Sequence, residues 1–193
     1  ICEPLELEYI ASNIATHGHE SVIIDMILER KSIAFFLEKY QPQVVGITGY
    51  IAHVNVIKDY AKQIKTYDSK LPVIVGGVHA EVNPEDFESE YIDYIIRANG
   101  LKTIITLLNR LEKKENTDGL DCVYYSGKQF VALQQAYLTA TSSETKWNQS
   151  ECRPEKELAF PYLFPDREKV NRYRLKYYYM FHRNCSLIKT SFG

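Results

Sequence analysis

Apolar residues in the first 111 positions follow two alternating patterns, one typical of amphipathic helices and one typical of buried strands. In residues 5–16 they recur every three or four positions, which is the spacing of one helix face, and Gly18 follows as a stop. Residues 44–48 form a short β-branched run, which predicts a strand buried on both faces. The same patterns predict further helices at 33–39, 54–67 and 103–111, and further strands at 21–25, 72–77 and 94–97.

Strands that alternate with helices in this way predict an α/β fold with a parallel sheet. Ligands of such sheets bind outside the carboxyl ends of the strands. We therefore expect a binding site at the loops that follow Ile47, Val75 and Ile96.

The regular pattern ends beyond residue 112. Residues 113–119 form a charged stretch typical of a linker, and residues 123–125 and 129–133, joined by Ser-Gly-Lys, predict a β-hairpin. Residues 139–157 show little periodicity, which indicates a further linker. From residue 160 onward the chain is rich in Pro, Tyr and Arg and predicts no regular element.

The composition excludes several classes of function. A formal net charge of -2 gives no basic footprint for nucleic acid, and no apolar run is long enough to span a membrane. No signal peptide is visible and the first residue is Ile, so we expect a piece of a cytoplasmic protein whose N-terminus lies upstream. The four cysteines have no C-x-x-C spacing, so we expect free thiols and no zinc site.

Small and polar residues follow three of the predicted strands. After the first of these, Thr48, Gly49 and Tyr50 combine a hydroxyl that can hydrogen-bond a ligand with a glycine that admits a flat group close to the backbone. A strand-to-helix turn capped by Thr48 is the alternative. After the next strand, Gly76 and Gly77 give either room for a bulky group or a tight turn. The other candidates are His79 and Ala80 in the second loop and Arg97, Asn99 and Gly100 in the third.

Motifs of other chemistries are absent from the sequence. It has no histidine pair at the spacing of a zinc site, no nucleophile elbow, and neither glycine-rich signature of a dinucleotide or triphosphate site. We therefore expect no protein metal ligand and no catalytic residue.

Four stretches stand in a fixed order within residues 4–111: PLELEYIASNIATHGHESVIID, QPQVVGITGYIAHVNVIKDYAKQIK, LPVIVGGVHAEVNPEDF and IDYIIRANG. Together they resemble the cobalamin-binding domain that precedes many radical S-adenosylmethionine (radical SAM) enzymes. The final residues, SLIKTSFG, resemble the lead-in to the C-x-x-x-C-x-x-C motif by which that family holds its iron–sulfur cluster.

The resemblance implies a flavodoxin-like, Rossmann-like sheet with the nucleotide tail of cobalamin at its carboxyl edge. It implies that Thr48 and Tyr50 lie beside this tail, with Gly49 between them, and that Gly76 and Gly77 make room for its base.

It further implies that His79 and Ala80 lie in the loop beyond the base. Arg97, Asn99 and Gly100 match a loop that usually reads R-G-E-G, although Ala and Asn here replace the central Gly and Glu. That replacement puts the third contact in doubt.

Two features of the family are missing. The sequence has no D-x-H-x-x-G motif, so we expect no protein histidine on cobalt. The opening strand is also missing before Pro4, which would leave two strands without a ladder partner. The chain then closes the gap locally, exchanges an element with a second copy, or binds no cofactor.

The resemblance predicts three parts of the chain: a cobalamin-binding domain at 1–112, a hairpin extension at 113–135, and a linker at 136–193 that leads into a radical SAM barrel. The barrel is expected to belong to the same parent protein, to be absent here, and to pack against the Tyr- and Arg-rich segment at 172–179. Without it, exposed aromatic residues favour self-association.

The leading hypothesis is a parent enzyme that is a cobalamin-dependent radical SAM methyltransferase or ring-forming cyclase. Its 4Fe-4S cluster and S-adenosylmethionine would be held by the parent alone, so this chain by itself is expected to be inactive. The alternative is a non-catalytic flavodoxin-like module that senses cobalamin or a partner. A flavin- or nucleotide-binding domain is a third possibility.

Overall fold

The computed structural model describes residues 2–97, 100–117, 120, 122–125, 163–179, 182–183 and 185. The chain divides into two compact units. We call residues 31–154 the sheet unit, and residues 1–30 together with 155–193 the terminal unit. Each is described by itself.

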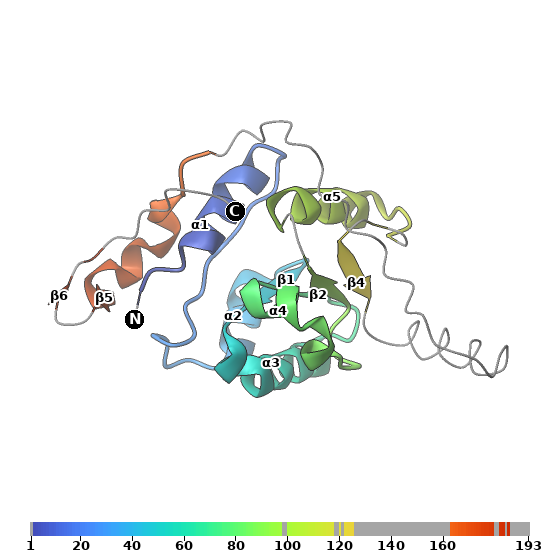
Figure 1. The fold of residues 1–193 in the computed structure, drawn as a ribbon, viewed down its shortest axis with the longest axis horizontal. Coiled ribbons are helices and arrows are strands. Elements are labelled where there is room, and N and C mark those ends of the chain that lie inside the picture. The colour runs from blue at the N-terminus through green and yellow to red at the C-terminus, as the bar shows by residue number, and fades with distance from the viewer. Residues whose placement is uncertain are drawn as a thin grey trace, which may run out of the picture. The chain divides into compact units, whose positions relative to one another are not determined.

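The sheet unit is built on a four-stranded sheet in the order β1-β2-β3-β4 (Figure 1). The pairs β1–β2 and β2–β3 are parallel, whereas β4 runs antiparallel to β3. The predicted α/β fold with a parallel sheet is therefore confirmed. The strands are β1 (Val45–Thr48), β2 (Val73–Gly76), β3 (Tyr94–Ile96) and β4 (Val123–Tyr125).

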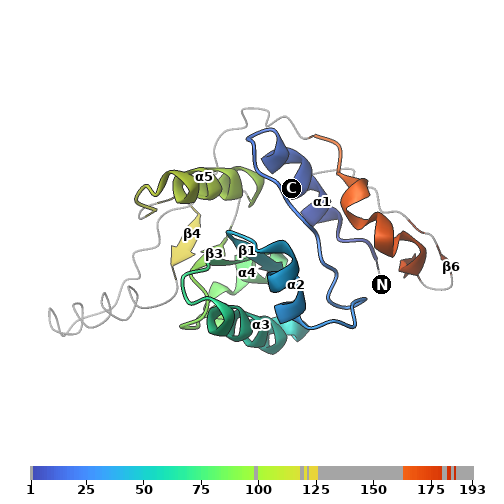
Figure 2. The same cartoon turned by 180° about the vertical axis from the view of Figure 1, so that it is seen from behind.

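Helices cover both faces of this sheet. One face carries α5, and the opposite face carries α2 and α3 (Figures 1 and 2). The three helices predicted in this unit are all present, and α3 has the predicted bounds. The elements are α2 (Ile33–Tyr40), η1 (Ile51–His53), α3 (Val54–Tyr67), α4 (Val78–Val82), η2 (Pro84–Phe87) and α5 (Gly100–Lys113).

The core of the sheet unit lies between α3 and the strands. Ile57, Ala61 and Ile64 are spaced to share one face of α3, and all three are buried. They belong to one cluster with Val73 and other apolar residues of β2 and β3. Burying an Ile or Val side chain contributes about 1.5–3 kcal/mol, so this face fixes α3 against the sheet.

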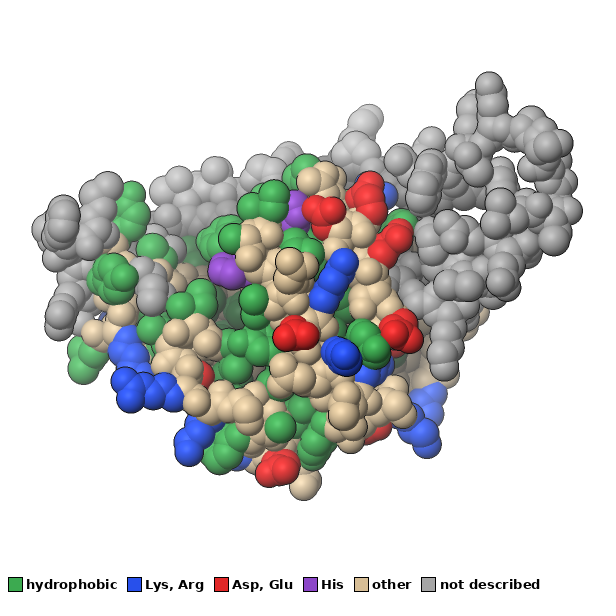
Figure 3. All heavy atoms as spheres, turned by 90° about the horizontal axis from the view of Figure 1, so that it is seen from below, with side chains coloured by type: hydrophobic (Ala, Val, Ile, Leu, Met, Phe, Trp, Pro, Cys, Tyr) green, Lys and Arg blue, Asp and Glu red, His purple; other side chains and the backbone are tan. Residues whose placement is uncertain are grey.

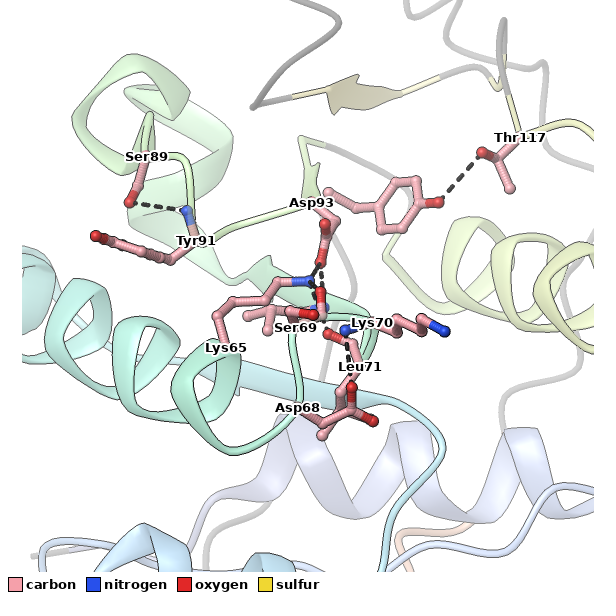
Figure 4. Close-up of polar contacts among 11 residues, drawn as sticks. Lys65, Asp68, Ser69, Lys70, Leu71, Ser89, Tyr91, Asp93 and Thr117 are labelled. Carbon is pink, nitrogen blue, oxygen red and sulfur yellow. Dashed lines mark hydrogen bonds and ion pairs between the residues drawn. The ribbon is translucent and has the colours of Figure 1, made fainter.

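A polar clamp at the amino end of β2 holds the opposite end of the sheet from the predicted site (Figure 4). Lys65 of α3 places its Nζ 2.6 Å from Oδ2 of Asp93 and donates to the carbonyl oxygen of Leu71 at 2.8 Å. The same Asp93 oxygen accepts from the backbone N–H of Val73 at 2.7 Å. One lysine therefore ties the end of α3 to the start of β2 and to the residue before β3.

β1 stands at the edge of the sheet, because among the described residues it pairs with β2 alone. Val45 and Ile47 are half-buried and pack on the core, whereas Gly46 and Thr48 are exposed. The prediction of a strand buried on both faces is therefore wrong for β1. Only one of its faces is covered by packed side chains.

The terminal unit pairs helices from the two ends of the chain. Figure 1 draws α1 (Leu5–Ala15) in blue beside η3 (Arg167–Lys176) in orange. A buried cluster joins Ala11 of α1 and Ile23 to Val170, Tyr173 and Tyr177. The helix predicted at 5–16 is thus confirmed. No pattern in the sequence predicted η3, nor the short antiparallel pair β5 (Tyr178–Tyr179) and β6 (His182–Arg183).

The strand predicted at 21–25 does not form, although the segment is rich in β-branched residues. Side chains of η3 hydrogen-bond its backbone in place of a neighbouring strand. The N–H of Asp25 donates to the hydroxyl of Tyr173 at 3.3 Å, and Arg172 donates to the carbonyl oxygen of Ile23 at 3.0 Å. A strand needs a ladder partner, and here the polar groups are satisfied without one.

Three remaining predictions concern the hairpin, the thiols and membrane-spanning helices. The second hairpin strand, at 129–133, lies outside the described residues. Cys2 and Cys185 are free thiols, whereas Cys122 is disulfide-bonded, so the expectation of free thiols is wrong for Cys122. Within the described ranges, no helix combines the length and the apolar character that crossing a bilayer requires.

Candidate functional site

The carboxyl ends of β1 and β2 meet at one edge of the sheet. Thr48, the last residue of β1, is in register with Gly76, the last residue of β2. Gly46 and the small side chain of Thr48 lie on the same exposed face of β1, because successive residues of a strand point to opposite faces. This edge therefore has a floor of small residues: Gly46, Thr48, Gly76 and Gly77.

The two loops approach each other most closely at Gly77. Its φ is +106°, a backbone conformation that side chains with a Cβ rarely adopt. A Cβ at this position would lie 2.4 Å from Oγ1 of Thr48, which is too close for any real contact. Glycine at 77 is thus required both by its backbone and by the threonine opposite.

The first loop is held from below by His53. Nδ1 of His53 accepts a hydrogen bond from the backbone N–H of Tyr50 at 3.2 Å. A Cβ on Gly49 would lie 3.1 Å from Cβ of His53 and 3.1 Å from Cδ1 of Ile57, so the loop backbone rests on these side chains. The Tyr50 ring is itself 73% exposed.

The second loop leads into α4, which carries the next two predicted site residues, His79 and Ala80. The two residues lie in different surroundings. Ala80 is buried in the core of the sheet unit and does not reach the edge. His79 places Nε2 2.8 Å from Oδ2 of Asp86, and its ring packs edge-on against Phe87 with ring centres 5.6 Å apart. The imidazole is therefore engaged with η2.

The third predicted loop follows β3. Arg97 donates its backbone N–H to the carbonyl oxygen of Cys122 at 2.9 Å, and its Nε is buried without a hydrogen-bond partner among the described residues. Gly100 is exposed and begins α5. Asn99 lies outside the described residues, as does Ala98.

In the segments that follow β1 and β2, four large apolar residues are each at least 68% exposed, and the sequence analysis did not single out three of them. Ile51 is 68% exposed, Val78 70% and Val82 68%, and Tyr50 is the fourth. Each follows one of the two glycine loops, at a position where α3 and α4 do not bury it. Apolar residues directly after a glycine turn were the available signal. They make this edge suitable for a large, partly apolar ligand.

Among the described residues, no group of three His, Cys, Asp or Glu side chains is placed to hold a metal ion. Burial raises the pKa of Tyr124, and the hydrogen bond that its hydroxyl donates to Glu88 at 2.6 Å raises it further. This phenol belongs to β4, however, and not to the loops after β1 and β2. On the face shown in Figure 3, acidic and basic side chains are interspersed among hydrophobic ones.

Two known proteins are similar to this chain in sequence. The chain is 31% identical over 122 residues to an uncharacterized methyltransferase of Pyrococcus horikoshii, and the match covers 61% of this chain and 26% of that protein. It is 30% identical over 123 residues to the hopanoid C-3 methylase of Methylococcus capsulatus, covering 60% of this chain and 24% of the methylase. The chain thus spans about a quarter of the length of these relatives.

A solved structure shows the same fold. It is the radical S-adenosylmethionine methyltransferase TsrM from Kitasatospora setae with cobalamin and a [4Fe-4S] cluster bound; the TM-score is 0.58 at 20% identity, over 67% of this chain and 25% of that one. Residues 1–108, more than half of the chain, match the family model described as the B12 binding domain. The chain therefore belongs to the B12-binding domain family.

Proposed function

We propose that residues 1–112 bind cobalamin at the carboxyl edge of β1 and β2. The observation that carries this proposal is the exposed floor of small residues where these two strands end, in a chain of the B12-binding domain family. Thr48, Gly49, Tyr50, Gly76 and Gly77 are the residues that we assign to the cofactor. Arg97, Asn99 and Gly100 are assigned to it more remotely, in the third loop.

The residues at this edge fit the group in three ways. The exposed Thr48 hydroxyl can donate or accept one hydrogen bond. The small floor leaves space above the sheet, because a Cβ on Gly46 would meet no atom within 4 Å. The exposed apolar side chains at positions 50, 51, 78 and 82 can cover a bound ring system and exclude water.

Cobalamin, when bound, would supply a cobalt centre that carries a methyl group or tunes a radical step. The chain's own task is then to bind and orient it. We propose that no histidine of this chain ligates cobalt.

We further propose that this chain is a domain of a longer radical SAM enzyme that performs methyl transfer. The names of its relatives, a methyltransferase and a methylase, support this proposal. Oxidative cyclisation is the second reaction class that the resemblance allows. The 4Fe-4S cluster, S-adenosylmethionine and a radical SAM barrel would belong to the rest of the parent, and we expect no turnover by residues 1–193 alone.

The proposal of cobalamin binding is tested by titrating the purified chain with hydroxocobalamin. Binding is expected to shift the visible spectrum and to keep the cofactor with the protein through gel filtration. Gly46→Leu is the test of the site, because a Cβ at this position would meet no atom within 4 Å and the larger side chain would then occupy the exposed floor. A folded Gly46→Leu chain that binds as well as the wild type would contradict the assignment of this edge.

The alternative is a non-catalytic module that senses cobalamin or a partner. Reading the parent gene beyond residue 193 separates the two functions. A Cys-x-x-x-Cys-x-x-Cys motif there supports the enzyme, and a DNA-binding domain or a stop codon there supports the sensor. We propose a cytoplasmic protein in either case.

Self-association is proposed for the isolated chain. Phe164 is 93% exposed and Leu175 78% exposed in the terminal unit, which offers apolar surface to a second molecule. Light scattering across a range of concentrations tests this, and a monomer at all concentrations would contradict it.

A further inference from the structure

Two histidines follow the two glycine loops of the edge, and each has a ring nitrogen committed to the protein itself. His53 ends η1, directly after the loop of Gly49 and Tyr50. His79 lies in the first turn of α4, two residues after Gly77. Each histidine therefore lies within five residues of the end of its strand, at the start of the segment that follows the loop.

The contact made by His53 fixes the first loop. Its Nδ1 accepts the N–H of Tyr50, the residue at which the chain turns from β1 into η1. The same nitrogen would lie 3.3 Å from a Cβ on Gly49, so the ring stands directly under the loop backbone. Without this acceptor, the backbone N–H of Tyr50 would have to be satisfied by water.

The contact made by His79 fixes the second loop. Its side chain is 9% exposed, its Nε2 lies 2.8 Å from Asp86, and its ring packs on the buried Phe87. Since α4 begins one residue after Gly77, an anchor at position 79 sets the direction in which Val78 leaves the loop. η2 thereby holds the start of α4.

We propose that His53 and His79 are positioning residues of the cobalamin edge, each holding one glycine loop at the spacing that the ligand needs. They act through Tyr50 and Asp86 and do not contact cobalt. This inference rests on the proposed function, because it assigns a role in binding the same cofactor.

The chain offers a matched pair of variants at each position. In His53→Asn the amide oxygen can replace Nδ1 as an acceptor, and in His79→Gln the amide N–H can replace the Nε2 donor toward Asp86. His53→Leu and His79→Leu keep a side chain of moderate size but remove the hydrogen bond. His17→Asn, at an exposed position of the terminal unit, is the control for a histidine change elsewhere.

The experiment measures the affinity of each folded full chain for hydroxocobalamin by visible absorbance. We expect the two Leu variants to bind about tenfold more weakly, because loss of one hydrogen bond that orders a loop typically costs about that factor. The Asn and Gln variants should bind within about twofold of the wild type, as should His17→Asn. Without cobalamin, the amides of residues 49–51 in His53→Leu and 77–82 in His79→Leu should exchange with solvent faster than in the wild type.

The possible outcomes distinguish a failure of this inference from a failure of the proposed function. A wild-type chain that does not bind hydroxocobalamin contradicts the proposed function. Given binding by the wild type, Leu variants that bind equally well overturn the positioning role. Asn and Gln variants as weak as the Leu variants also overturn it, since the imidazole itself would then be needed. If the Leu variants do not fold, the affinities of the Asn and Gln variants decide. Retained affinity supports the positioning role, and lost affinity overturns it.

Discussion

Thr48 and Gly77 meet across two loops that lie far apart in the sequence, and the contact leaves no room for a side chain on the glycine. Oγ1 of Thr48 stands 2.4 Å from the place of a Cβ on Gly77. The parallel register that pairs Thr48 with Gly76 brings the two together. The close approach thus follows from the fold and lies where the cofactor is proposed to bind.

Gly77→Ala should lower the stability of the sheet unit by about 1–3 kcal/mol, because the new Cβ adds a clash with Thr48 to an unfavourable φ. Gly18→Ala is a matched control, since φ at Gly18 is +86° and a Cβ there would meet no atom within 4 Å. Urea unfolding of both variants measures the difference. Equal losses of stability would show that the Thr48 contact contributes nothing.

Lys65→Met should lower the stability of the sheet unit by about 1–2 kcal/mol. The methionine keeps the aliphatic packing but loses the ion pair to Asp93 and the hydrogen bond to the Leu71 carbonyl. Lys62→Met, on an exposed position of the same helix, is the control and should change the stability little. The midpoints of urea unfolding compare the two, and identical midpoints would argue against the clamp.

Glu8 makes the stability of the terminal unit depend on pH. It is fully buried, and neither carboxylate oxygen has a hydrogen-bond partner among the described residues. Burial and then the nearby charge of Glu3 raise its pKa from 4.5 to about 7, with further contributions from Asp166 and Glu6, while Arg167 opposes the rise. The Tyr177 phenol, whose own pKa Glu8 helps to raise, also faces this carboxyl.

Because the folded pKa of Glu8 lies above the unfolded value, the folded unit binds the proton more tightly. The resulting stability is present below pH 4.5 and is lost as the pH rises to about 7. Glu8→Gln should therefore stabilise α1 by about 1–3 kcal/mol at pH 8 and change it little at pH 4. Hydrogen exchange of the α1 amides at the two pH values measures this, with exposed Glu20→Gln as the control. An equal effect of Glu8→Gln at both values would contradict the assignment.

Tyr173→Phe should loosen the contact between η3 and residues 25–29. The hydroxyl donates to Oε1 of Glu29 at 2.5 Å and accepts the N–H of Asp25, and burial raises its pKa to about 12. Removing it leaves two partners unsatisfied, at a cost of about 1–2 kcal/mol. Tyr179→Phe is the control, because that ring is 56% exposed. Tyrosine near-ultraviolet circular dichroism during thermal unfolding compares the variants, and a shared transition temperature would count against this role.

Most of the sheet unit could be predicted from sequence, because each element carries its own period. Ile57, Ala61 and Ile64 repeat at helix spacing, and the predicted bounds of α3 are those observed. The parallel order of the strands then indicated which loops would share an edge. Thr48, Gly49, Gly76 and Gly77 were placed at the carboxyl ends of their strands for that reason, and the structure brings them together.

The errors share a different cause, which is that the deciding contact lies far away in the sequence. Residues 21–25 have strand composition, yet Arg172 and Tyr173 satisfy their backbone from the other end of the chain. The contact of His79 with Asp86 was also not predicted, because Asp86 lies on a separate 3-10 helix that shows no periodicity. α4 itself has only 5 residues, too few for a helical period to be visible.

The pairing of α1 with η3 also fixes an order of assembly on the ribosome. Every described strand of the sheet unit has been synthesised before η3 emerges, whereas α1 (Leu5–Ala15) packs on a helix that begins only at Arg167. Closing so long a loop is slow compared with pairing neighbouring strands. During translation the nascent chain therefore carries the apolar side of α1 uncovered until residues 167–176 are made, and an uncovered apolar helix is a segment that chaperones recognise.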